Sequence, residues 1–191
     1  QVASPERYIA NCLGSGMYHY RVGAHEPEGR PFEEGAFRLS RLQPVFAWRF
    51  YQNEHRYSLS QGIPTLSVVN DHIHSAQSRT QPTGISYASA GCQVVEGDQT
   101  DAGIEGLYQT FRLFAGLSAQ PHRDEIGLPY QYLLTHTRHL EAIALGSRAL
   151  ILQHGSQGHL VRSVQEALMA ADFLDEDHID KGYFNGATTL A

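Results

Sequence analysis

Residues 45–50 read Val45-Phe46-Ala47-Trp48-Arg49-Phe50, an apolar and aromatic run that contains neither Gly nor Pro. Such a composition favours a strand over a helix. Comparable short runs, most of them bounded by turn-forming residues, recur at residues 65–69, 93–95 and 130–134. Because short apolar runs between turn formers are typical of sheets, the sequence predicts a mainly β fold for residues 1–146.

Two stretches depart from this pattern and predict helices. Between residues 104 and 114 the apolar side chains are three and four positions apart, with Asp101 as the expected N-cap. Between residues 158 and 173 a second helical stripe combines Leu160, Val161, Val164, Leu168 and Ala171. The expected fold is therefore a β-rich domain with one or two helices, followed by a small α-helical unit at residues 147–191.

The composition limits the classes of protein to consider. The chain has 191 residues, of which 41% are hydrophobic and 18% charged, and its formal net charge is −6. These values argue against a disordered chain and against a nucleic-acid partner, because a negative surface repels phosphates. No apolar run is long enough to cross a bilayer, so we expect no membrane span. We also expect a monomer and, since the chain begins at Gln1 rather than Met, a removed upstream segment.

Residues 147–191 carry a pattern of small and apolar residues. It runs Leu150-x-x-x-His154-Gly155-Ser156-x-Gly158-x-x-Val161-x-x-x-Gln165-x-x-Leu168 and continues as Asp180-Lys181-Gly182-Tyr183-Phe184-Asn185-Gly186-Ala187-Thr188. The pattern resembles the peptidoglycan-binding domain 1 family, whose members are small three-helix modules. It departs from the family at Ser163-Val164, where a Leu is expected before the Gln, and at the inserted residues Lys181 and Asn185.

This resemblance implies that residues 147–191 bind the bacterial cell wall. It also implies an N-cap at Thr188 for a third helix, which the end of the chain truncates. The physical pattern alone, a helical stripe with a Gly-containing turn, predicts only a small helical addition.

The most specific constellation is a His and a Cys flanked by small residues. His74-Ser75 is followed by Ser89-Ala90-Gly91-Cys92-Gln93-Val94, so that Cys92 follows His74 by 18 positions. A cysteine hydrolase or acyltransferase needs a thiolate, an imidazole that takes its proton, and backbone N–H groups aimed at the developing oxyanion. Ala90 and Gly91 leave room for a substrate carbonyl to approach. The pattern therefore indicates a Cys–His site.

This arrangement resembles the catalytic motif of L,D-transpeptidases (YkuD domains), in which an upstream His is followed by Ser or Thr, His, Gly and the nucleophilic Cys. His74, Ser89, Gly91 and Cys92 match the motif. Ala90 replaces the second His of the motif. Val94 stands where an Arg or Asn commonly follows the Cys.

The resemblance implies a role for each residue of the motif. Cys92 would be the nucleophile and His74 the base, with the backbone carbonyl of Ser75 orienting the imidazole. The N–H groups near Gly91 and Cys92 would form the oxyanion hole. The residues expected to contact substrate are Ser89, Ala90, Gln93 and His72.

Other interpretations stay open at this point. A Cys beside a Gly is often a buried small hydrophobe, in which case the β-rich domain is an inactive recognition module. His72 is close enough in sequence to His74 to be the base itself. A zinc peptidase or amidase is a further possibility, with ligands from His72-x-His74 and His136-x-x-His139, although no H-E-x-x-H motif is present.

The remaining cysteine and most other histidines have no expected chemical role. Cys12 is interpreted as structural or incidental, and at most one disulfide is available to the chain. The histidines expected to be solvated include His19, His25, His122, His154, His159 and His178.

Together these observations predict a cysteine enzyme that acts on peptidoglycan stem peptides through a thioester. It would be an L,D-transpeptidase or L,D-carboxypeptidase, periplasmic or extracellular, associated with the cell wall and independent of any metal or other cofactor. The alternatives are a catalytically inactive wall-binding protein and a zinc-dependent peptidoglycan hydrolase.

Overall fold

A computed structural model describes residues 10–25, 33–42, 44–50, 61–76, 89, 91–100, 103–146 and 151–191. The chain divides into two compact units that interleave along the sequence. Unit 1 contains Gln1–Tyr18, Arg41–Val69 and Gln131–Ala191, and unit 2 contains His19–Ser40 and Asn70–Tyr130. The division into domains at residue 146 stays a prediction.

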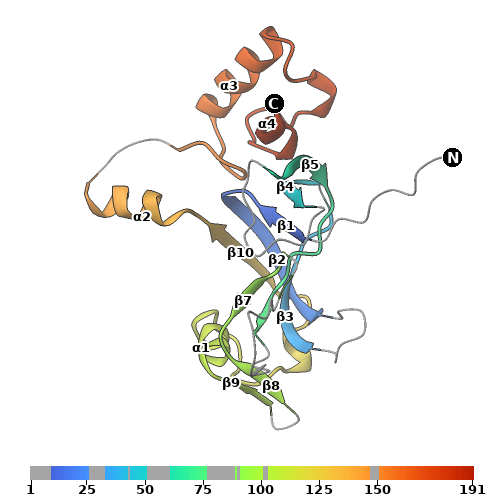
Figure 1. Ribbon diagram of the computed structural model, residues 1–191, viewed down its shortest axis with the longest axis vertical. Helices are drawn as coiled ribbons and strands as arrows, with labels where there is room; N and C mark the ends of the chain where they lie inside the picture. The colour runs from blue at the N-terminus through green and yellow to red at the C-terminus, as the bar shows by residue number, and fades with distance from the viewer. Residues whose placement is uncertain are drawn as a thin grey trace, which may run out of the picture. The chain divides into compact units, whose positions relative to one another are not determined.

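Strands dominate the described residues, and the expected mainly β character is confirmed (Figure 1). The strands are β1 (Ala10–Leu13), β2 (Gly16–His25), β3 (Glu33–Leu39), β4 (Val45–Phe50), β5 (Ile63–Ser67), β6 (Ile73–Ser75), β7 (Gln93–Val95), β8 (Asp98–Thr100), β9 (Gly103–Glu105) and β10 (Pro129–Leu134). The helices are α1 (Leu107–Phe114), α2 (Thr137–Ala144), α3 (His159–Ala170) and α4 (Gly186–Leu190), with short 3-10 helices η2 (Arg123–Glu125) and η3 (Glu176–His178). Strands β4, β5, β7 and β10 lie at the four predicted runs.

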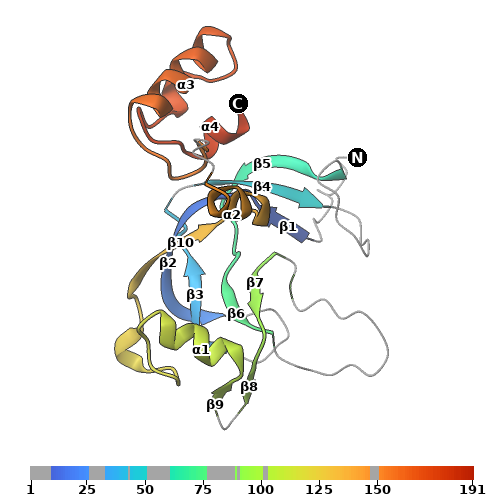
Figure 2. The same ribbon diagram turned by 90° about the vertical axis from the view of Figure 1, so that its left-hand side faces the viewer.

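Unit 2 is built on strands β2, β3, β6 and β7, which are neighbours in that order in one sheet (Figure 2). Strand β3 pairs antiparallel with β2 and β6, whereas β6 and β7 are parallel. Its core includes the almost fully buried Tyr20, Phe37, Ile73 and Tyr108. The Tyr108 hydroxyl lies 3.0 Å from the carbonyl oxygen of Gly35 and 3.3 Å from that of Ile73, which anchors α1 to β3 and β6.

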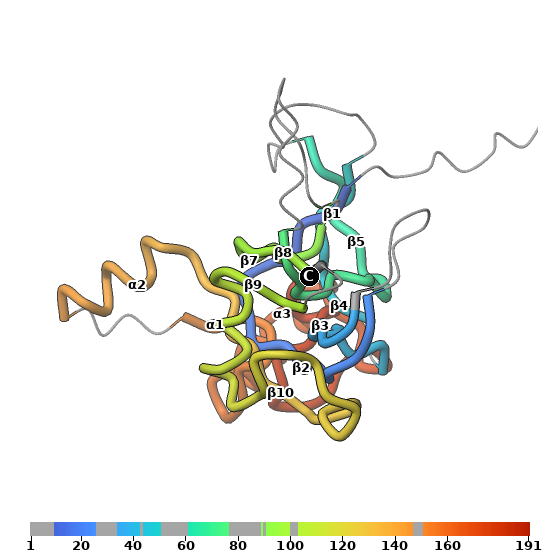
Figure 3. The backbone as a smooth tube through the Cα atoms, turned by 90° about the horizontal axis from the view of Figure 1, so that it is seen from below, coloured from blue at the N-terminus to red at the C-terminus, as the bar shows by residue number. Residues whose placement is uncertain are grey.

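Helix α1 starts later than the sequence predicts. Residues 104–114 were expected to be helical, but Ile104 lies in β9, which pairs antiparallel with β8. The side chain of Gln120 accepts from the Ile104 N–H at 2.6 Å and donates to its carbonyl oxygen at 2.9 Å, which holds Ile104 in the hairpin. The predicted N-cap, Asp101, lies outside the described residues, and the N-cap is Gly106 with a φ of 77°. Figure 3 shows β9 leading into α1.

A buried ion pair joins α1 to η2. Arg112 Nη2 lies 2.5 Å from Glu125 Oε2, and the Arg112 side chain is fully buried. The guanidinium also donates to the carbonyl oxygens of Gly35 and Ser118, at 2.6 and 3.2 Å. The Glu125 carboxylate accepts from the N–H groups of Ser118 and His122. Burial raises the pKa of Glu125, but these hydrogen bonds and the Arg112 charge outweigh it and hold the pKa below its ordinary value of 4.5.

Unit 1 contains a three-stranded antiparallel sheet with the order β1-β4-β5. From the central strand, the buried Arg49 donates to Asn11 Oδ1 at 3.0 Å and to Ser67 Oγ at 2.8 Å. Helix α4 packs on β4 and β5. Gly186 permits this close approach, because a Cβ there would lie 3.0 Å from the carbonyl oxygen of Pro44 and would also collide with the Leu66 side chain of β5.

Helix α3 lies within the predicted range 158–173 but ends at Ala170. The predicted apolar stripe is only partly covered, since Val161 is fully buried whereas Leu160 is exposed. The covered face is completed by a polar side chain, that of Gln165, which is 1% exposed.

Gln165 connects α3 to the loop before α4. Its Nε2 donates to the carbonyl oxygens of Asp180 and Tyr183 and to Thr188 Oγ1 at 3.0–3.2 Å. Its Oε1 accepts from the Gly182 N–H at 2.8 Å. One buried amide therefore satisfies polar groups from two later segments of the chain.

Replacing Gln165 by Leu would leave these buried groups without their partner. Each unsatisfied group costs about 1–3 kcal/mol, so we expect the free energy of unfolding to fall by at least about 2 kcal/mol. Urea denaturation followed by circular dichroism measures the change. Gln157→Leu is the matched control, because Gln157 is exposed. Equal midpoints for the two variants would contradict the role given to Gln165.

The predicted Thr188 N-cap is wrong, since α4 begins three residues earlier. Asn185 is the N-cap, and its Oδ1 accepts from the Thr188 N–H at 2.9 Å and from the Thr188 hydroxyl at 3.0 Å. Asn is a strong N-cap residue for this reason. Thr188 instead occupies the third helical position and is buried against Gln165.

Helix α2 lies outside both predicted helices. It contains no buried residue, and Leu140 and Ile143 are both more than half exposed. In the part of the chain that the structure describes, no helix is both long and apolar enough to cross a bilayer.

Candidate active site

Two short parallel strands bring the predicted Cys and His together in unit 2. His74 of β6 lies opposite Val94 of β7, and the Gln93 N–H donates to the His72 carbonyl oxygen at 2.9 Å. Because the strands are parallel and in register, the residues that precede them also lie side by side. Cys92, which directly precedes β7, therefore lies next to His72, which directly precedes β6.

The Cys92 thiol has backbone groups on two sides. The His72 N–H donates to Cys92 Sγ at 3.3 Å, and Sγ lies 3.4 Å from the carbonyl oxygen of Asn70, to which the thiol donates. Cys92 is half-buried and forms no disulfide. The backbone N–H would stabilise negative charge on the sulfur, whereas the carbonyl oxygen favours the protonated thiol, so a base is needed to take the proton.

His74 is held in one orientation by its neighbour. The ring is buried, and its Nδ1 lies 2.7 Å from the backbone carbonyl oxygen of Ser75. A carbonyl oxygen only accepts, so Nδ1 carries the proton and the lone pair of the neutral ring is on Nε2. This is the contact that the sequence resemblance implies for Ser75. It leaves His74 in the tautomer that accepts a proton.

His74, Cys92 and a third residue, His25, form one cluster. One ligating atom from each of the three side chains lies within 4.8 Å of the other two. The His25 ring stacks on that of His74, with centroids 4.3 Å apart and an interplanar angle of 19°. His25, which the sequence predicts to be solvated, is half-buried, because the end of β2 carries it to the ring of His74. The strand pairing between β2 and β3 places it there, and the local sequence around His25 contains no signal of this.

His72 is arranged differently from His74. Its Nδ1 accepts from the Leu39 N–H at 3.3 Å, so in the neutral ring the proton is on Nε2. To accept a proton from Cys92, His72 would need to change tautomer and lose this hydrogen bond. His74 is therefore the better placed base, and the expected contact of His72 with substrate stays a prediction.

The turn before Cys92 is built from hydrogen bonds among predicted site residues. Ser89 Oγ accepts from the Gly91 N–H at 3.0 Å, and Gln93 Nε2 donates to the Gly91 carbonyl oxygen at 3.4 Å. The Tyr20 hydroxyl lies 3.0 Å from Gln93 Oε1. Ala90 lies outside the described residues. The Gly91 N–H would have to leave Ser89 to stabilise an oxyanion, so the catalytic role of Gly91 and the substrate contacts of Ser89 and Gln93 stay predictions.

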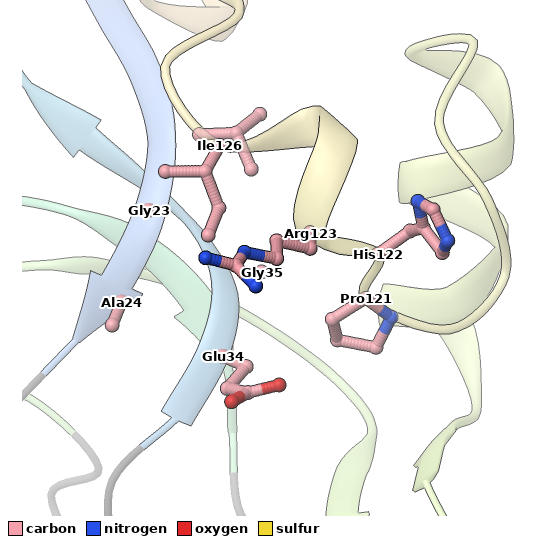
Figure 4. A pocket seen from close by; sticks show the side chains of 9 residues that line it. Gly23, Ala24, Glu34, Gly35, Pro121, His122, Arg123 and Ile126 are labelled. Carbon is pink, nitrogen blue, oxygen red and sulfur yellow. The ribbon is translucent and has the colours of Figure 1, made fainter.

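Unit 2 also contains a pocket of about 300 Å³, which is formed by β2, β3 and the segment around η2. Its lining includes Glu34 and Arg123, two side chains of opposite charge (Figure 4). Cys92, His74 and His25 are not among its lining residues. The pocket is therefore separate from the thiol site.

The remaining predicted histidines divide between surface and core. His19, His122, His159 and His178 are exposed, as expected. His154 is buried in unit 1, where its ring stacks on Tyr18 at a centroid distance of 4.9 Å, so the expectation of a solvated His154 is wrong. The Cys12 side chain is exposed, and the rings of His136 and His139 lie 5.5 Å apart in unit 1.

No known protein family, curated protein or solved structure matches this chain. The functional argument therefore depends on the residues of the cluster and on their geometry.

Proposed function

We propose that the protein is a peptidoglycan-active cysteine enzyme in which Cys92 attacks stem peptides and His74 is the base. The observation that carries this proposal is the placement of the two side chains. A ring nitrogen of His74 lies within 4.8 Å of Cys92 Sγ, and the contact with Ser75 fixes the tautomer in which Nε2 accepts a proton. Catalytic hydrogen bonds are often longer in the free enzyme and shorten when substrate binds.

The first step is the acylation of Cys92. His74 takes the thiol proton, and the sulfur attacks the amide carbonyl before a terminal D-amino acid. His74 then gives its proton to the leaving amine, which departs as the free D-amino acid, and a thioester remains on Cys92. Burial of the His74 ring limits competition from water for the proton.

The second step depends on the acceptor. An amine from another stem peptide attacks the thioester, loses a proton to His74 and forms a new amide, which is transpeptidation. Attack by water releases a carboxylate, which is carboxypeptidase action. Both routes regenerate the thiol, so the site needs no further cofactor for either reaction.

The choice of peptidoglycan as substrate is supported by the sequence motifs of both parts of the chain. The YkuD-like pattern includes Cys92 and His74, and the C-terminal pattern resembles a wall-binding module. In that segment the Gln165 network and the close packing of Gly186 give physical reasons for two of the pattern's residues. An exported, wall-associated location follows from the same proposal.

The assignment of the base is tested by His74→Gln. Removing a general base typically lowers the rate by 10²–10⁴-fold, so we expect muropeptide conversion, followed by mass spectrometry, to fall by about that factor. His19→Gln is the matched control, since His19 is exposed on the same sheet, and we expect it to retain the wild-type rate. A larger loss in His72→Gln than in His74→Gln would move the base to His72. No conversion of any stem peptide by the wild type would contradict the proposed function.

A further inference from the structure

The His25–His74–Cys92 cluster has the donor set of a metal site. In a tetrahedral zinc site, bonds of about 2.0–2.3 Å place the ligand atoms roughly 3.3–3.8 Å apart. The three ligating atoms here already lie within 4.8 Å of one another. Small side-chain movements would therefore bring them to bonding distance around one ion.

The chemistry of the donors favours a borderline-soft divalent metal. A thiolate and two imidazoles suit Zn²⁺ far better than Mg²⁺ or Ca²⁺, which prefer oxygen ligands. Three protein ligands leave one tetrahedral position for water or another small ligand. Such a site would take Zn²⁺, or Co²⁺ in its place.

The surroundings of two ligands also match those of metal ligands. A ligating His usually donates its second ring nitrogen to a carbonyl oxygen, which fixes the orientation of the ring. His74 Nδ1 makes this contact with the Ser75 carbonyl oxygen at 2.7 Å and leaves the Nε2 lone pair for a metal. The His72 N–H at 3.3 Å from Cys92 Sγ would stabilise the charge of a metal-bound thiolate. Stacking on His74 limits the positions open to the third ligand, His25.

We propose that His25, His74 and Cys92 bind one Zn²⁺ ion, and that this ion inhibits the enzyme. On binding, Cys92 loses its thiol proton to solvent and its sulfur forms a bond to zinc, while one nitrogen of each imidazole donates a lone pair. One proton is released for each ion bound, so the affinity falls as the pH is lowered. The inhibition rests on the proposed function, because zinc occupies both the nucleophile and the base. The binding of zinc does not rest on the proposed function.

Metal binding is tested on the full chain after removal of metals with a chelator. Titration with Co²⁺ should give a spectrum with tetrahedral d–d bands and a thiolate-to-cobalt charge-transfer band in the near ultraviolet, at one ion per chain. Zn²⁺ should then displace the cobalt. We expect Cys92→Ser to lose the charge-transfer band. We expect His25→Phe, which keeps an aromatic ring on His74, to weaken zinc affinity by more than the roughly 10–100-fold that follows loss of a group hydrogen-bonded to a metal ligand.

Two controls match these variants. Cys12→Ser removes the other thiol, and His19→Phe makes the same replacement at an exposed position of β2, so both should bind like the wild type. A cobalt spectrum without thiolate character, or equal affinities in His25→Phe and His19→Phe, would overturn the metal site.

The inhibitory role is measured separately, by muropeptide conversion with and without Zn²⁺. Inhibition is supported if the protein converts muropeptides in the presence of a chelator and this conversion falls to zero at one equivalent of Zn²⁺ per chain. Conversion that requires Zn²⁺ would overturn it and indicate a zinc hydrolase. Metal binding by a protein that converts no muropeptide under either condition would overturn the inhibition and the proposed function together, and would leave the metal site standing.

Discussion

Replacing Cys92 by Ala should abolish the conversion of muropeptides. The sulfur is the only atom in the proposed mechanism that bonds to the substrate, and loss of a nucleophile in comparable catalytic sites lowers the rate by a factor on the order of 10⁴–10⁶. Mass spectrometry of a stem tetrapeptide before and after incubation measures the loss of its terminal D-amino acid and the formation of cross-linked dimers. The substitution removes only the sulfur, with its hydrogen bonds to the His72 N–H and the Asn70 carbonyl oxygen, so the fold should be retained.

The second cysteine supplies the control for this experiment. Cys12 is exposed on β1 in unit 1, and Cys12→Ala should convert muropeptides at the wild-type rate. If Cys92→Ala converts as fast as Cys12→Ala, the thioester mechanism is wrong. The open alternative would then be that the β-rich part of the chain only recognises the wall.

The largest effect on stability is expected for Arg112→Met. Removal of one partner from a buried ion pair typically costs about 3–5 kcal/mol, because it leaves the other charge buried and uncompensated. In this variant the Glu125 carboxylate would lose its partner at 2.5 Å, and the Gly35 carbonyl oxygen would lose a donor at 2.6 Å. Chemical denaturation measures the change. Arg123→Met, at an exposed position of η2, is the matched control and should change stability by less than about 0.5 kcal/mol.

The Arg112–Glu125 ion pair also makes the stability of the fold depend on pH. The pKa of Glu125 lies below its ordinary value of 4.5 in the folded state, so its contribution is complete above that value. As the pH falls below 4.5 through the lowered folded pKa, the carboxylate is protonated and the contribution is lost. Wild-type stability should therefore decline in this window. In Arg112→Met the decline should be smaller, because the pair is already broken, and an equal decline in both proteins would contradict this role of the pair.

The sequence identifies those elements that depend on local composition. The aromatic run at 45–50 forms β4, and the short run at 93–95 forms β7, because a strand needs little more than extended, half-buried side chains between turns. The stripe around Val161 likewise marks α3. The start of α1 is not predictable in this way, because the side chain of a distant residue, Gln120, holds Ile104 in a hairpin.

In the candidate site, too, some residues can be predicted from the local sequence and others depend on distant parts of the chain. The spacing of His74 and Cys92, with Ser75 after the His, is visible in the sequence because His74 and Ser75 lie in β6 and Cys92 directly precedes the neighbouring strand β7. His25 is not visible, because it enters the cluster only through the pairing of β2 with β3, and periodicity cannot show which strands pair. His154 is missed for a related reason, since its burial depends on Tyr18, far away in the sequence.

The central claim, that His74 activates Cys92, is tested most directly by alkylation of the two thiols in one molecule. Metal-free protein is treated with iodoacetamide at neutral pH, and peptide mass spectrometry gives the rates at Cys92 and at the exposed Cys12. An ordinary thiol is only a few per cent thiolate at this pH, so an activated Cys92 should react at least about tenfold faster than Cys12, despite being less exposed. His74→Gln should remove that excess and leave the Cys12 rate unchanged. A Cys92 that reacts no faster than Cys12 in the wild type, with no effect of His74→Gln, would contradict the account.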